Sequence, residues 1–433
     1  MAGVPTGGFS LKSPVPLPSL QVRVLLLVSF AWLIAGYDIN LLGLVLKSVG
    51  QEFGVAQGRE AEIVMWARFG VLLAFPLAML ADRFGRRTIL LITICGSAVT
   101  TLLTAFAQNE FQFVTLQASV RMFGYAQDMV SIVVIAEEID DRARGWALGL
   151  LAASAAVGGG MSAIIFAGID ILPYGWRALY VIGAVPIFVI AWFWRTMPET
   201  RRFKEMQAQK KLVAQPSGLK VALHKLHLLT VVNGRRFFSM LAVTAPLAIG
   251  VTCATVLFPT FLQSDVKLDP AIVTAIYVGG GLFGLFGNFI AGRLSDKHGR
   301  KPVFAVAGIA FITAMLGLYL GPHDQLWLIA VLWGVSIFAF FALEVVMGAW
   351  SAELFPTELR STASGSRLAV NIIAGGAALL AQTFLYDELG GHALSIAVLL
   401  PALVIAVIVA WITIPETSGK TLEEIQAEGA RRG

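Results

Sequence analysis

Charged residues and cysteines are scarce in this 433-residue chain. Only 14% of its residues are charged and 57% are hydrophobic, whereas a soluble domain carries about a quarter charged residues. The two cysteines, Cys95 and Cys253, both lie in apolar stretches, so they form neither a disulfide framework nor a metal-ligand motif. The composition therefore excludes an ordinary soluble domain and indicates a chain that is dissolved in a lipid bilayer.

Catalytic constellations are also missing. The sequence has no nucleophile–base arrangement, metal-ligand cluster or phosphate-binding glycine loop, which argues against an enzyme. The net charge of +5 comes from Lys and Arg in short loops between apolar stretches and not from one basic patch. A nucleic-acid partner is therefore not expected, and the basic residues are typical of loops on the cytoplasmic side of a membrane.

Twelve apolar stretches are each long enough to cross about 30 Å of hydrocarbon at about 1.5 Å per residue. Each is expected to be a helix, because lipid cannot satisfy the polar groups of an exposed backbone. The predicted spans are residues 22–47, 61–80, 88–107, 111–135, 145–168, 176–196, 238–262, 271–294, 302–320, 326–350, 362–385 and 391–414.

The distribution of Lys and Arg predicts the orientation. Loops on one side, and the stretch 199–236 between spans six and seven, are rich in these residues, whereas the opposite loops hold only Lys47, Arg59, Arg177 and Lys267. Both termini should therefore face the cytoplasm of a multi-pass plasma-membrane protein, with a bacterial inner membrane as the expected location. The predicted division is a disordered cytoplasmic N-terminus (1–21), a six-helix bundle (22–196), a cytoplasmic linker (197–237), a second six-helix bundle (238–414) and a cytoplasmic tail (415–433).

The two halves repeat one another. A basic cassette, Asp-(Arg/Lys)-x-Gly-Arg-(Arg/Lys), occurs at Asp82–Arg87 and again 214 positions later at Asp296–Lys301. A Glu followed seven residues later by Arg occurs twice at an offset of 216, as Glu137 with Arg144 and Glu353 with Arg360. These repeats predict an all-α membrane protein whose twelve transmembrane helices form two pseudo-symmetric six-helix bundles, one of the known plans of secondary transporters.

These motifs resemble the signatures of the major facilitator superfamily, and the resemblance covers nearly the whole chain. The signature Gly-x-x-x-Asp-(Arg/Lys)-x-Gly-(Arg/Lys)-(Arg/Lys) is complete at Gly292–Lys301, and in the first half Ala78 replaces its leading Gly. Pro415–Ile425 resembles the C-terminal signature of sugar porters, but the glutamines of their sugar site are missing from spans five and seven. Gly36-Tyr37-Asp38 together with Arg121 looks more like the proton-coupled symporters of organic acids and other metabolites.

The cassettes and the Glu and Arg residues near them are predicted to form a cytoplasmic latch. Such a latch would hold the cytoplasmic side shut in the outward-open state and break when that side opens; the alternative is a plain topological anchor. Asp128 and Glu344, which also repeat at an offset of 216, are assigned to the same network. The predicted latch residues are Asp82, Arg83, Gly85, Arg86, Arg87, Asp128, Glu137, Arg144, Asp296, Lys297, Gly299, Arg300, Lys301, Glu344, Glu353 and Arg360.

Three charges lie deep in the predicted spans without a charged counterpart in the other half: Asp38, Arg68 and Arg121. Charge in a bilayer is costly, so a function is expected for them. We expect Asp38 to carry the proton and Arg121 to be its exchangeable partner, with Asp38 taking up a proton when an anionic substrate binds Arg121. A static buried ion pair is the alternative.

Four residues are predicted to contact substrate, namely Arg68, Arg121, Gln263 and Asn371. Arg367 lies about five residues inside span eleven and is expected to reach the membrane interface instead.

The sequence thus predicts a proton-coupled symporter that imports a small organic anion, such as a carboxylate, by alternating access. A sugar or polyol transporter and a transporter-like solute sensor are the alternatives. The expected partners are a small-molecule substrate, protons and membrane lipids. The proton gradient would supply the energy without a cofactor, and the chain is expected to be a monomer.

Overall fold

The computed structural model describes residue 13, residues 15–184, residues 218–420 and residue 424. Within these ranges the chain is helical and contains no strand. Of the N-terminus predicted to be disordered (1–21), residues 1–12 and 14 lie outside the described residues, whereas residues 19–21 are already helical. Also outside the described residues are the end of span six (185–196), the linker up to residue 217 and most of the tail beyond residue 420.

The helices of the first half follow the predicted spans closely. Their bounds are α1 (Ser19–Phe53), α2 (Glu60–Phe69), the 3₁₀ turn η1 (Gly70–Leu73), α3 (Ala74–Met79), α4 (Ala81–Phe84), α5 (Arg86–Thr104), α6 (Glu110–Glu138), α7 (Asp141–Phe166) and α8 (Trp176–Ala184).

The second half begins after a helix in the linker, α11 (Gly218–Val231), which packs on α12 and α17. Its further helices are α12 (Gly234–Val256), α13 (Phe258–Ser264), α14 (Pro270–His298), α15 (Arg300–Leu320), α16 (Leu326–Glu353), α17 (Thr357–Leu389), α18 (His392–Ala397) and α19 (Ala402–Thr413).

Ten helical stretches in the described part are both long and apolar enough to cross a membrane. Two of the twelve predicted spans are not among them. Helix α6 has 29 residues but carries Gln117, Arg121 and Asp128 along its length, and span six is described only as far as Ala184.

Prolines explain where two spans are interrupted. Pro76 has no N–H to donate to the carbonyl of Leu72, and the 3₁₀ turn η1 lies at this point. Pro259 stands in the first turn of α13, where N–H groups have no partner within the helix in any case. Span seven therefore consists of two helices, α12 and α13.

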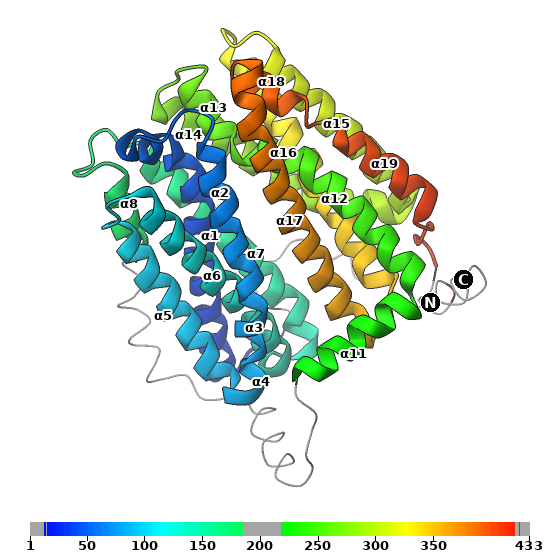
Figure 1. Ribbon diagram of the computed structural model, residues 1–433. Helices are drawn as coiled ribbons and strands as arrows, with labels where there is room; N and C mark the ends of the chain where they lie inside the picture. Colours follow the sequence, from blue (N-terminus) through cyan, green and yellow to red (C-terminus); the bar gives the residue numbers. More distant parts are fainter. Residues whose placement is uncertain (1–12, 14, 185–217, 421–423, 425–433) are drawn as a thin grey trace.

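The helices pack as two bundles that lie side by side (Figure 1), with α1 to α8 in blue to teal and α11 to α19 in green to red. Within the first bundle the main packing pairs are α1 with α7 and α5 with α6; within the second they are α14 with α16, α15 with α16, and α12 with α17 and α19. Between the bundles, α2 packs on α17, α7 on α14 and α1 on α13. We call the end that holds Gly85 and Gly299 the cassette end.

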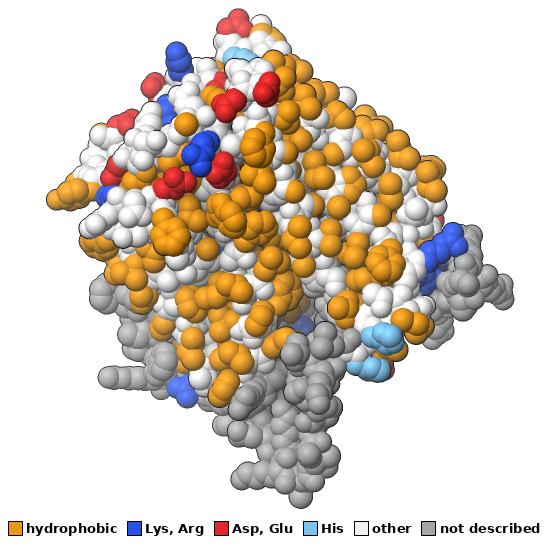
Figure 2. Space-filling view, viewed as in Figure 1, with side chains coloured by type: hydrophobic (Ala, Val, Ile, Leu, Met, Phe, Trp, Pro, Cys, Tyr) orange, Lys and Arg blue, Asp and Glu red, His pale blue; other side chains and the backbone are white. Residues whose placement is uncertain are grey.

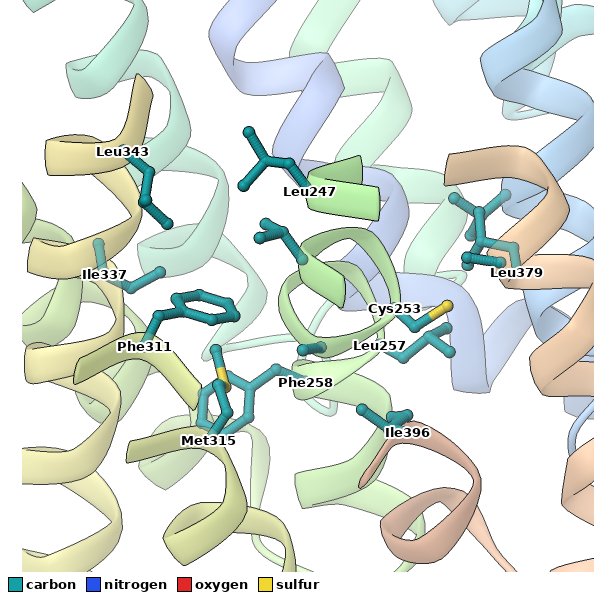
Figure 3. Packing of buried hydrophobic residues seen from close by; sticks show 14 of the residues in the cluster. Leu247, Cys253, Leu257, Phe258, Phe311, Met315, Ile337, Leu343, Leu379 and Ile396 are labelled. Atoms are coloured by element: carbon teal, nitrogen blue, oxygen red, sulfur yellow. The ribbon is translucent and has the colours of Figure 1, made fainter. Parts of the chain in front are cut away.

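The bundles share a core at the end opposite the cassettes. Leu41 and Val45 of α1 belong to the same buried cluster as Phe258 and Phe261 of α13. Figure 3 shows how apolar side chains of several second-half helices converge in this cluster. At the cassette end, the first half has a separate core drawn only from its own helices, including Val28, Ile94, Val134 and Leu151. The two halves are therefore packed together at one end and independently packed at the other.

The surface is apolar around the middle of the molecule. In Figure 2, hydrophobic side chains cover the centre of this face from side to side, whereas acidic and basic side chains gather at the upper end. Large apolar side chains such as Val306, Ile309 and Ile412 are more than half exposed. Such a surface is unfavourable in water and matches the hydrocarbon of a bilayer.

Candidate functional site

A cavity of about 240 Å³ lies between the two halves. The first half contributes Arg68 from α2 and Tyr125 from α6, and the second half contributes residues of α12, α16 and α17. The apolar part of its wall is formed by Leu247, Ala248, Val251, Phe340, Leu343 and Leu368. The polar residues of the second half that line it are Thr252, Thr255, Glu344, Arg367 and Asn371.

Arg68 and Asn371, both predicted to bind substrate, meet in this cavity. Arg68 Nη2 lies 3.4 Å from Asn371 Oδ1, which is a long hydrogen bond between opposite halves. Arg68 Nε has no hydrogen-bond partner in the described part of the chain. The guanidinium therefore keeps donor capacity that a bound anion could use.

Glu344 and Arg367 also line the cavity, in contrast to their predicted places. Glu344 was assigned to the latch and Arg367 to the interface, but Arg367 Nη1 lies 3.5 Å from Glu344 Oε2 across the cavity wall. The start of α17 explains the difference for Arg367, because the helix begins at residue 357 and places Arg367 ten residues inside it. Glu344 lies nine residues before Glu353, about 13 Å deeper along α16.

Asp38 lies in the middle of α1 and is almost fully buried. Thr101 Oγ1 of α5 donates a hydrogen bond of 2.7 Å to Asp38 Oδ2, whereas Asp38 Oδ1 has no hydrogen-bond partner among the described residues. Arg121 lines the same narrow cavity as Asp38, and no direct ion pair joins the two in the described part of the chain. Tyr125 lines both this narrow cavity and the central one. The proton-coupling candidates are thus adjacent to the central cavity but not part of its wall.

Gln263 does not reach the central cavity. Its side-chain amide donates to the carbonyls of Leu44 and Pro259, at 3.0 and 3.1 Å, and it is buried at the end opposite the cassettes. In this conformation the amide is thus used where the two halves meet, and Gln263 is not among the residues that line the central cavity.

Further hydrogen bonds close this opposite end. Lys47 Nζ donates to the backbone carbonyl of Gln263 at 2.7 Å, and Tyr277 Oη donates to Asn40 Oδ1 at 2.8 Å. Thr274 Oγ1 donates to the carbonyl of Ala163 at 2.9 Å. Each of these bonds joins the first half to the second. Together with the shared apolar core, they hold the halves together at this end.

The cassettes form matching joints. Gly85 connects α4 to α5 with φ 103° and ψ 144°, and Gly299 connects α14 to α15 with φ 100° and ψ 150°. Beside each joint a cassette arginine pairs with the repeated glutamate of its own half. Arg86 lies 3.4 Å from Glu137, and Arg300 lies 2.8 Å from Glu353.

The remaining predicted latch residues are arranged differently. Arg300 also pairs with Asp296 at 2.7 Å, Lys301 Nζ donates to the carbonyl of Trp411, and Arg144 donates to the carbonyl of Ala136. The repeated glutamate of each half is thus paired with the cassette arginine of that half. Among the described residues, no ion pair joins Glu353 to Arg360, the arginine seven residues after it. Lys297 is exposed and Arg87 half-buried, and the side chains of Asp82 and Arg83 lie outside the described residues.

Asp128, like Glu344, does not join the cassette network as predicted. Asp128 Oδ1 has no hydrogen-bond partner in the described part of the chain. Glu344 faces Arg367 in the central cavity instead. Each acid lies nine residues before the repeated glutamate of its half, about 13 Å farther from the cassettes along α6 or α16.

Glu416 has an anchoring role that was not predicted from the sequence. Glu416 accepts hydrogen bonds from the backbone N–H groups of Arg300 and Lys301, at 2.8 and 3.0 Å, so it caps the first turn of α15. The next residue, Thr417, donates to Glu353 Oε2 at 2.6 Å. The sequence Pro-Glu-Thr occurs at residues 198–200 and again 217 positions later at residues 415–417. This repeat was a signal for a structural role, but only the fold reveals that Glu416 caps α15.

Comparison with known proteins identifies the family. The sequence matches the Major Facilitator Superfamily over residues 28–246 and 240–432. It is 27% identical to the cis,cis-muconate transport protein of Acinetobacter baylyi over 83% of this chain and 86% of that protein. It is 22% identical to the gallate transporter of Pseudomonas putida over 80% of this chain and 81% of that protein.

Among solved structures, the D-xylose-proton symporter has a similar fold. It matches with a TM-score of 0.74 and 18% identity, over 93% of this chain and 100% of that one. The predicted fold class, two six-helix bundles in a membrane, is thereby confirmed. The chain belongs to the major facilitator superfamily and is a membrane transporter rather than an enzyme.

Proposed function

We propose that this transporter is a proton-coupled symporter that imports a small organic carboxylate across a bacterial inner membrane. The observation that carries the proposal is the placement of Arg68 in a cavity between the halves, next to a buried acid, Asp38, in an adjoining cavity. A guanidinium with spare donors in an otherwise partly apolar cavity suits the carboxylate and the carbon skeleton of such a substrate.

The relatives support the choice of substrate class. One is named for the transport of cis,cis-muconate and another for that of gallate, and both compounds are small organic acids. In the present chain, the apolar wall formed by Val251, Phe340 and Leu343 would contact the carbon skeleton of the acid, while Arg68 and Asn371 would bind a carboxylate.

We place the cassette end on the cytoplasmic side, because basic loops are retained there. The cross-half hydrogen bonds at the opposite end would then seal the periplasmic side, and the cavity would be reached from the cytoplasm. Alternating access would rock the bundle of residues 22–196 against that of residues 238–414. In the outward-open state the cassettes would close the cytoplasmic side as a latch.

Proton coupling would run through Asp38. In the described structure Asp38 receives one hydrogen bond, from Thr101, and has one oxygen without a partner. An ionised carboxylate is costly at this depth unless a cation is close, and Arg121 in the same narrow cavity is that cation. Movement of Arg121 toward a bound anion would favour the protonated acid, so the anion and the proton would bind together.

The test measures internal pH in proteoliposomes that contain the purified protein while small carboxylates are added outside one at a time. We expect a particular acid to acidify the lumen beyond the passive leak seen in protein-free liposomes. Asp38→Asn should abolish this acidification but retain exchange of the labelled acid across the membrane. Asp170→Asn, which alters an exposed aspartate after α7, is the matched control and should behave like the wild type.

Two results would contradict the proposal. If Asp38→Asn acidifies the lumen as the wild type does, Asp38 does not carry the proton. If no acid moves protons but labelled sugars or polyols equilibrate, the protein transports neutral solutes and Asp38 has a packing role.

A further inference from the structure

The central cavity contains one acid and two bases. Arg68 comes from the first half, and Arg367 and Glu344 come from the second. With all three ionised, the wall carries one net positive charge. Asp38 and Arg121 do not change this count, because they line the adjoining cavity and offset each other.

The Glu344–Arg367 contact is loose compared with the other ion pairs of the second half. Its shortest N–O distance is 3.5 Å, and the side chains are 34% and 20% exposed. Arg300, by contrast, holds Asp296 at 2.7 Å and Glu353 at 2.8 Å. Strong charge-assisted hydrogen bonds measure about 2.7–2.9 Å, so Glu344 holds Arg367 weakly. A second carboxylate that entered the cavity could reach Arg367 only by displacing Glu344, against the repulsion of its negative charge.

We propose that Glu344 determines which carboxylates the central cavity binds; this inference rests on the proposed import of a carboxylate. Glu344 acts as a tethered carboxylate that occupies Arg367 and keeps the net charge of the cavity wall at one. The cavity then binds an acid with a single carboxylate and an apolar skeleton, through Arg68 and Asn371. An acid with a second carboxylate must compete with Glu344 for Arg367 and is disfavoured by its charge.

The role of Glu344 differs from that of a residue that merely supports the fold. Replacing it by Gln removes the negative charge, frees Arg367 and raises the net positive charge of the wall from one to two. Acids with two carboxylates should therefore gain affinity, and acids with one should change little. A structural role would weaken both classes together.

The experiment compares acids that share a skeleton and differ in charge, namely sorbate with trans,trans-muconate and benzoate with terephthalate. Their affinities for the purified full-length protein are measured by titration calorimetry at constant salt. In the wild type we expect the single carboxylates to bind better. In Glu344→Gln the ratio of affinities should shift toward the dicarboxylates by about tenfold.

Three further variants complete the test. Glu344→Asp keeps the charge and should keep the wild-type preference, and Arg367→Gln should weaken the dicarboxylates in the Glu344→Gln background. Glu62→Gln, in which the altered residue pairs with Arg59 near the start of α2, is the control and should leave the ratio unchanged. Melting temperatures of all variants exclude misfolding as the cause of any loss.

The outcomes separate this inference from the proposed function. If the wild type binds carboxylates and Glu344→Gln leaves the ratio of affinities as it was, the role of Glu344 is refuted and the proposed function stands. If the wild type binds no carboxylate of either class and moves no protons with any acid, both proposals are refuted.

Discussion

Gly85 and Gly299 show how single residues shape the joints between helices. Both have φ near 100° and ψ near 150°, a region that only glycine adopts without strain. At Gly299 a Cβ atom would also lie 2.9 Å from Glu416 Oε2, closer than side chains normally pack. The glycine in each cassette is therefore required by its backbone conformation.

Gly299→Ala should lower the free energy of unfolding by about 1–3 kcal/mol, because alanine is strained in this conformation and its Cβ displaces Glu416. Thermal unfolding in detergent measures the effect. Gly149→Ala is the matched control, because Gly149 is helical and a Cβ there meets nothing within 4 Å. An equal loss of stability in both variants would show that the conformation of Gly299 is not responsible.

The partner of each buried charged residue depends on the exact position of single residues in the packed helices. Asp38 was expected to pair with Arg121, yet its hydrogen bond comes from Thr101, a residue that no sequence pattern singles out. Likewise, Glu353 pairs with Arg300 and not with Arg360. Each outcome depends on which side of its helix a residue occupies and on which helix faces that side.

Among the helices, α15 depends on a residue far along the chain. Its first turn has N–H groups without partners inside the helix, and Glu416 accepts hydrogen bonds from two of them. Partial burial favours the protonated form of this acid, but hydrogen bonds from the backbone of Arg300, Ser418, Lys301 and Thr417 outweigh it and lower the pKa of Glu416. The cap thus ties the end of the last span to the second cassette.

The lowered pKa of Glu416 predicts a pH dependence. Its stabilising effect is complete above the pKa of an unfolded glutamate, about 4.3, and is lost as the pH falls through the lower folded value. Glu416→Gln should therefore lower the melting temperature at pH 7, and its difference from the wild type should shrink toward pH 4 and below. Glu388→Gln, at an exposed residue near the end of α17, serves as the control. A difference that stays constant from pH 7 to pH 3.5 would contradict the cap.

In the whole molecule, the end opposite the cassettes is closed by bonds between the halves. Tyr277 donates to Asn40 across the boundary, while Tyr319 donates to Ala254 within the second half. The two hydroxyl groups form hydrogen bonds of the same length, 2.8 Å, but only the bond of Tyr277 joins one bundle to the other.

Tyr277→Phe should shift the protein away from this conformation. A hydrogen bond contributes about 0.5–1.5 kcal/mol, so its loss should change the ratio of the two conformations several-fold. Distances between spin labels on Asp170 and Asp324, which are exposed residues of opposite halves, would report the opening of this end. Tyr319→Phe should reduce stability without changing the distance distribution. Equal distance distributions for Tyr277→Phe and the wild type would show that this hydrogen bond does not hold the end closed.

The sequence alone determined the framework of this protein. The lengths of the apolar stretches predicted the helices, because a bilayer imposes a minimum span and forbids unsatisfied backbone groups. The repeated cassettes predicted the two halves, because the same residue types recur at a nearly constant offset. The domain boundaries and the orientation remain predictions.

Only the tertiary structure decided which charges meet and which end is closed. It placed Glu344 and Arg367 in the central cavity with Arg68, and it used Gln263 to close the opposite end. These contacts join helices that are distant in sequence, and they depend on the rotation and tilt of each helix and on how the two bundles lean together. No local pattern encodes such relations, so they emerge only when the helices are packed.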